Sequence, residues 1–92
     1  MASVTIELPA MLRRVAGVPG SIALEADSLD GALRALTERH PALDVHLFDE
    51  TGGLRQHVLC FHNRTNTRWL PSADVALAAG DTITILQAVS GG

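Results

Sequence analysis

Apolar residues recur at every second position in two segments of the first third of the chain. Residues 3–8 and residues 21–26 each place apolar side chains at every second position. This two-residue period is typical of half-buried β-strands. Pro9 ends the first strand because proline cannot donate to a strand ladder. The connection, residues 10–20, carries turn-forming glycine and proline and is short enough for a hairpin.

The hydrophobic period changes to that of a helix after residue 26. Apolar side chains recur at spacings of three and four and therefore share one helix face: Leu29, Ala32, Leu33 and Leu36. Ser28 or Asp27 can cap the first amides, and Pro41 stops the helix. The pattern predicts an amphipathic helix from about Leu29 to His40.

The second half of the chain predicts further strands separated by turns. In chain order we expect a short helical turn around Val45–Phe48, a buried strand within residues 54–63, a turn at Asn63–Arg64, a short edge segment at residues 67–70, a tight turn at residues 78–81, and a last strand over residues 82–89.

The order β-β-α-β-(β)-β predicts one α+β domain, residues 1–92, with the β-grasp architecture. In this two-layer fold one main helix lies across one face of a mixed sheet of four to five strands. The first and last strands lie side by side in parallel at the centre. The end of the chain then leaves the sheet as a free tail, at about residues 90–92.

Composition excludes several classes of function. The chain has 92 residues, 47% of them hydrophobic, and a net charge of −3 that predicts no nucleic-acid partner and no anionic membrane surface. It contains no apolar run of the length that a membrane span needs and no signal-peptide pattern, so we expect a cytoplasmic protein. One cysteine excludes a disulfide framework.

The tail ends in Ser90-Gly91-Gly92. Glycine lacks a Cβ, so Gly91 and Gly92 can adopt unusual backbone angles and pass through a narrow channel. Frayed termini are also commonly rich in glycine, and the significance of the pair therefore depends on the body that carries it.

The whole chain resembles the ubiquitin-like sulfur-carrier proteins of the ThiS/MoaD family. The resemblance rests on "VTIELPAMLRRVAG", the helix opening "DSLDGALRAL", "HLFDETGGLRQHVLCFHN" and "LAAGDTITILQAVSGG". Within the family, the tail is similar to that of the actinobacterial carriers used for cysteine biosynthesis. His62 departs from the family pattern, because relatives usually have an apolar residue at this position.

The resemblance implies that an E1-like adenylating enzyme uses ATP to activate the carboxylate of Gly92, with Ser90 and Gly91 needed for access. A sulfur donor then displaces AMP and leaves a thiocarboxylate that donates sulfur in biosynthesis. The chain would be a protein cosubstrate rather than an enzyme, with no catalytic residues, no metal and no bound cofactor. Its partners would be the activating enzyme and a sulfur-acceptor enzyme that resembles cysteine synthase, and we expect a monomer when it is free.

Three alternatives use the same residues differently. The chain could be the small subunit of molybdopterin synthase, whose partner is the large subunit of that enzyme, or a ubiquitin-like protein modifier. The letters "DSLD" at residues 27–30 also resemble the phosphopantetheine site of acyl carriers, but those proteins are helical bundles, and Asp and Ser are ordinary helix caps.

Cys60, His62 and His57 are candidates for a nucleophile or a metal site. On a strand, Cys60 and His62 share a face and His57 points to the other, which leaves fewer ligands than zinc requires. A buried structural thiol is the favoured interpretation of Cys60.

The sheet face that the helix leaves uncovered is expected to meet water or a partner. Leu59 and Phe61 are its candidate docking residues. Trp69 either covers the core at the sheet edge, which we favour, or joins the docking surface.

Overall fold

The computed structural model describes residues 2–51, 54–55, 58–67 and 75–87. Its strands form a five-stranded mixed sheet in the order β2-β1-β5-β3-β4. In chain order the elements are β1 (Ala2–Glu7), α1 (Ala10–Ala16), β2 (Ser21–Ala26), α2 (Leu29–Arg39), the 3-10 helix η1 (Pro41–Leu43), α3 (Asp44–Leu47), β3 (Val58–His62), β4 (Thr65–Asn66) and β5 (Thr82–Gln87).

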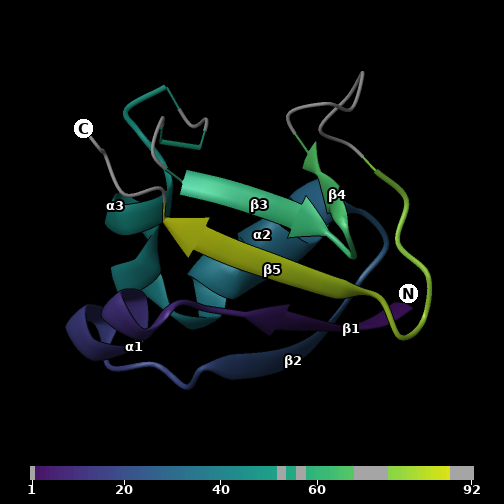
Figure 1. Ribbon diagram of the computed structural model, residues 1–92, viewed down its shortest axis with the longest axis horizontal. Helices are drawn as coiled ribbons and strands as arrows, with labels where there is room; N and C mark the ends of the chain where they lie inside the picture. Colours follow the sequence, from purple (N-terminus) through teal and green to yellow (C-terminus); the bar gives the residue numbers. More distant parts are fainter. Residues whose placement is uncertain (1, 52–53, 56–57, 68–74, 88–92) are drawn as a thin grey trace.

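The sheet has the predicted topology. β1 pairs with β2 in an antiparallel hairpin and with β5 in parallel, from Thr5 opposite Thr82 to Glu7 opposite Thr84. β3 pairs antiparallel with β5 on its other side. β5 is therefore held between two strands, and α2 crosses behind the sheet (Figure 1).

Helix α1 occupies the connection between β1 and β2, where the sequence pattern predicted only turns. Pro9 precedes it in an extended conformation, and Gly17 closes it at a φ of 65°, where its N–H donates to the carbonyl of Arg13. Leu12 is fully buried and fixes the helix to the core. Seven residues are too few for a helical period to be recognised, so only the terminal glycine and proline signals were visible.

The amphipathic helix α2 confirms its prediction within one residue. It begins after Ser28, whose Oγ accepts a hydrogen bond of 3.1 Å from the N–H of Gly31, and it ends at Arg39. All four residues of the predicted apolar face are buried. The predicted turn near Val45 is the short helix α3.

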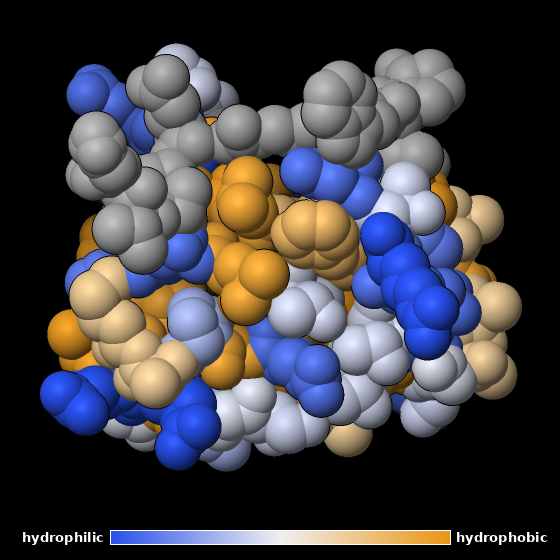
Figure 2. Space-filling view, in the orientation of Figure 1, coloured by the Kyte–Doolittle hydropathy of each residue, from blue (hydrophilic) through white to orange (hydrophobic). Residues whose placement is uncertain are grey.

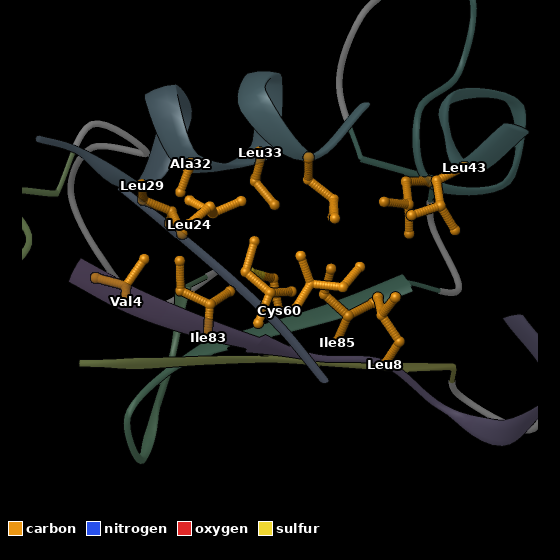
Figure 3. Packing of buried hydrophobic residues seen from close by; sticks show 14 of the residues in the cluster. Val4, Leu8, Leu24, Leu29, Ala32, Leu33, Leu43, Cys60, Ile83 and Ile85 are labelled. Carbon is orange, nitrogen blue, oxygen red and sulfur yellow. The ribbon is translucent and has the colours of Figure 1, made fainter. Parts of the chain in front are cut away.

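The core lies between α2 and the sheet (Figure 3). Strands β1, β2, β3 and β5 contribute the alternate residues that the sequence predicts, and Ile83 and Ile85 of β5 are fully buried. No polar or charged residue belongs to the buried set among the described residues. The apolar side chains of α2 point down toward those of the strands, so one core holds both layers together.

Some predicted features fall outside the described residues. These are most of the edge segment at residues 67–70, including Trp69, the last two residues of the predicted final strand, and the tail with Ser90, Gly91 and Gly92. In the described part of this region, β4 comes directly after the predicted turn at Asn63–Arg64. None of the described helices is long and apolar enough to cross a membrane.

Candidate functional site

β5 is the strand from which the tail continues. Its last residue, Gln87, is paired with Val58, and Ile83 and Ile85 are fully buried. The five residues from 88 to 92 can span at most about 17 Å when extended. Any enzyme that acts on the carboxylate of Gly92 must therefore come within this distance of the end of β5.

An apolar patch lies on the open face of the sheet, which is the face opposite α2. We define this open-face patch as Leu59, Phe61 and Leu86. Leu59 lies directly opposite Leu86 in the β3–β5 ladder, and Phe61 is opposite Thr84. Figure 2 shows apolar atoms gathered over β3 and β5 on this side of the molecule.

The exposure of the patch makes it available for contact. Leu86 is 42% exposed, whereas Leu59 and Phe61 are half-buried. The sequence predicted Leu59 and Phe61 as docking residues, but Leu86 was not among the predicted residues. The alternation of β5 could have found it, since Leu86 must face away from its buried neighbours Ile83 and Ile85.

A polar cluster at the beginning of β5 accounts for the unusual His62. The Nε2 of His62 is 2.7 Å from Oδ2 of Asp81, which also accepts a hydrogen bond of 2.9 Å from the N–H of Ala78. The side-chain amide of Asn63 donates to the other oxygen of Asp81 at 3.2 Å. Together, these bonds connect the end of β3 to the turn that precedes β5.

The same contacts hold the Asp81 carboxylate in its ionised form. Its pKa is lowered to about 2, first by the hydrogen bond from Ala78 and then by those from His62 and Asn63. Asn63 has a φ of 55°, and its backbone and side chain both bond to Thr82. The cluster therefore has a structural role that fixes how the chain enters β5.

Cys60 is buried in the core and is unsuited to nucleophilic chemistry. Cys60 is only 1% exposed. Burial raises the pKa of its thiol to about 11, although a hydrogen bond with Thr67 acts in the opposite direction. Because the thiolate is the reactive form, this thiol is inert at neutral pH. The interpretation of Cys60 as a buried structural thiol is confirmed.

Nothing in the described part of the chain forms a metal site. No group of three or more histidine, cysteine, aspartate or glutamate side chains converges there. His62 is engaged with Asp81, and Cys60 is buried. His57 lies outside the described residues.

This architecture defines a class of protein. A mixed sheet with parallel first and last strands, crossed by one main helix, is the ubiquitin-like β-grasp fold. The chain belongs to the ThiS family, whose model matches residues 6–92.

Individual relatives cover almost the whole chain. The sulfur carrier protein CysO of Mycobacterium tuberculosis is 30% identical over 92 residues, which are 98% of this chain and 99% of the relative. The small archaeal modifier protein 1 of Methanosarcina acetivorans has a solution structure with a TM-score of 0.83 and 34% identity, covering 100% of this chain and 98% of that one. A chain of the BexX/CysO complex of Amycolatopsis orientalis has a TM-score of 0.83 and 27% identity, covering 97% of this chain and 99% of that one.

Proposed function

We propose that this chain is a sulfur carrier whose C-terminal glycine, Gly92, becomes a thiocarboxylate. The observation that carries the proposal is the family match, which extends through residue 92. A 30% identical relative that is named a sulfur carrier, matched over 99% of its length, supports it. The β-grasp body supports it, because β5, which precedes the tail in sequence, is paired on both sides at the centre of the sheet.

The proposed chemistry takes place on the carboxylate of Gly92 in two steps. A free carboxylate is a poor electrophile, so an E1-like enzyme first joins it to the AMP part of ATP and releases pyrophosphate. A sulfide sulfur then attacks the carbonyl carbon, the bond to AMP breaks, and the thiocarboxylate remains. The chain is a protein cosubstrate in both steps, and ATP is bound by the activating enzyme.

The partner enzyme would recognise two parts of this chain, the small residues 90–92 and the open-face patch. Ser90 and Gly91 would lead Gly92 into the partner's catalytic site, since small residues fit a confined channel. The open-face patch would dock the body, since contiguous exposed apolar residues are typical of protein interfaces. A complex of a related chain with BexX is known by its crystal structure. For this chain we propose a sulfur-acceptor enzyme of the cysteine-synthase type as the second partner.

Intact-mass spectrometry tests the chemical proposal. The chain is incubated with ATP, an E1-like enzyme from the same organism and sulfide. We expect a mass increase equal to the difference between one sulfur and one oxygen atom, and none when ATP is omitted. An unchanged mass with an enzyme that activates another carrier under the same conditions would contradict the proposal.

Paired substitutions test the docking surface. Leu86→Asp places a charge in the open-face patch, and Val45→Asp places one at an exposed apolar residue of α3, where 62% of the residue is accessible. We expect Leu86→Asp to raise the KM for activation on the order of tenfold or more while kcat changes little, because an unpaired charge must be desolvated in the complex. Val45→Asp should leave both constants unchanged. Equal effects of the two substitutions would rule out docking through the patch.

One alternative is favoured by a specific observation. The chain is 34% identical to an archaeal protein named a modifier, and the match extends over the whole length of this chain. If this chain is also a modifier, the activated Gly92 would form amide bonds with lysine side chains of other proteins. Denaturing electrophoresis of a tagged chain from its own cells distinguishes the two, because a carrier alone gives no bands of higher mass that survive reduction.

A further inference from the structure

The edge strand β2 carries hydrogen-bonding groups that the sheet does not use. β2 is the outermost strand, next to β1 alone. Leu8 donates to the carbonyl of Gly20 on the β1 side at 2.9 Å, whereas the carbonyl of Ala23 is reached from the outside by Arg39. Since peptide groups alternate in direction along a strand, those of Ser21, Ala23 and Glu25 point away from the sheet.

A hollow of about 400 Å³ follows this edge. It is lined by Ser3, Ala23, Leu24, Glu25, Ala35 and Arg39. Two of these side chains, Ala23 of β2 and Ala35 of α2, carry only a methyl group, which leaves space beside the outward peptide groups. An exposed strand edge with free space alongside is the geometry to which an extended peptide adds.

The hollow is lined by one cationic residue, Arg39, and one acidic residue, Glu25, and Arg39 is the one bonded to the outward edge of β2. Its Nη1 donates to the carbonyl of Ala23 at 2.9 Å. A guanidinium group has five N–H donors, and among the described residues Arg39 forms no ion pair that would occupy the others. A carboxylate beside the edge would satisfy these donors with charge-assisted hydrogen bonds.

We propose that the β2 edge binds an extended segment of a protein partner that adds to the sheet as a further strand and places an acidic side chain against Arg39. This surface lies at the opposite edge of the sheet from β4. A second copy of the chain is the less suitable occupant. Antiparallel pairing of two β2 strands about Ala23 would bring two Arg39 guanidinium groups together, and like charges repel.

Nuclear magnetic resonance with a defined probe tests the proposal on the full chain. The probe is the blocked peptide acetyl-Val-Asp-Val-Thr-Val-amide, and the control peptide carries asparagine in place of aspartate. We expect amide shift changes at Ala23 and Glu25 with the acidic probe, and binding on the order of tenfold weaker with the control. Shift changes centred on the open-face patch, or none at millimolar probe, would overturn the proposal.

Two pairs of variants separate strand addition from unspecific contact. Ala23→Pro removes an N–H that points outward and leaves the bonds to β1 in place, whereas Ala23→Ser keeps both that N–H and a small side chain. Probe binding should be lost in Ala23→Pro and kept in Ala23→Ser. Arg39→Ala should weaken the acidic probe to the level of the control peptide, while Arg39→Lys keeps part of the preference.

Three further results would overturn the proposal. The first is equal binding by Ala23→Pro and the unchanged chain. The second is an Arg39→Ala variant that still prefers the acidic probe. The third is a dimer, seen by sedimentation in the absence of probe and abolished by Ala23→Pro, because the edge would then belong to a second copy. Thermal unfolding of each variant shows that the fold is retained.

Discussion

Asp81 has the largest number of side-chain hydrogen bonds among the residues that position β5. It accepts from Ala78, His62 and Asn63 at the point where the chain enters the central strand. At the end of β3, the imidazole of His62 is 2.7 Å from this carboxylate. The His62 and Asp81 side chains are 18% and 16% exposed, so the pair is largely shielded from solvent.

The Asp81 contacts predict a specific loss of stability in acid. The pKa of Asp81 is about 2 in the folded chain, below the ordinary aspartate value of 3.8. Its contribution to stability is therefore complete above about pH 4 and is lost as the pH falls toward 2. Urea unfolding should show that the difference in unfolding free energy between the unchanged chain and Asp81→Asn is largest near neutral pH and shrinks between pH 4 and pH 2.

A matched substitution provides the control for this experiment. Asp30 is exposed and pairs with Arg34 at 3.1 Å on the surface of α2. Asp30→Asn should change the unfolding free energy little at neutral pH, because exposed ion pairs contribute little. A stability difference for Asp81→Asn that stays constant down to pH 2 would contradict the assigned role.

Cys60 should be chemically silent in the folded chain. With the pKa of its thiol at about 11 and 1% of the residue exposed, alkylation by iodoacetamide at pH 8 should be far slower than in the chain unfolded by guanidinium. Cys60→Ser should lose about 1–3 kcal/mol of stability through a buried hydroxyl, yet it should still be converted to the thiocarboxylate. A folded Cys60→Ser chain that is not activated would move the sulfur chemistry to this residue.

Among the elements, α2 contributes most to the second layer, and its start is fixed by one side chain. The hydrogen bond from Gly31 to Ser28 satisfies an amide at the first turn that has no partner within the helix. The helix therefore begins at Leu29, and it is rotated about its axis so that its apolar face packs against the strands. The β-grasp arrangement depends on this rotation because all the buried residues of α2 face the sheet.

Ser28→Ala should destabilise the chain by about 1 kcal/mol, the usual effect of losing a helix cap. Ser21→Ala at the exposed start of β2 is the matched control and should have little effect. Thermal or urea unfolding of both variants measures the difference. Equal stability of the two would show that the cap does not contribute in this chain.

For the whole molecule, the proposed function separates a folded body from a reactive end. The core fixes β5, and in the proposed function the residues after Gln87 would contribute to recognition by the partner. Deleting Gly92 or introducing Gly91→Trp should abolish activation by the E1-like enzyme, because a bulky ring does not fit a channel made for bare backbone. Stability should change by less than about 0.5 kcal/mol.

Activation assays and melting temperatures measured on the same samples decide this prediction. Val45→Trp introduces the same ring at an exposed residue of α3, and this variant should be activated normally. Normal activation of Gly91→Trp would show that the end of the chain is not the reacting group. Loss of activation in Val45→Trp would show that the ring acts through a docking surface instead.

The sequence by itself determined the features that depend on local periodicity, on helix capping and on the C-terminal glycine pair. The alternation in β1 and β2, the apolar face of α2 and its cap at Ser28 all follow from neighbouring residues, because strand and helix periods are local properties. The order of these segments predicted the β-grasp architecture, and their likeness to a known family supplied the candidate role of Gly92.

Only the tertiary structure decided which distant residues meet. The β3–β5 register places Leu59 opposite Leu86 and brings His62 against Asp81, which is 19 residues away in sequence. Helix α1 was also decided at this level, since burial of Leu12 stabilises a segment too short to show a period. The physical reason is that strand pairing and burial are set by packing between elements, which no stretch of neighbouring residues encodes alone.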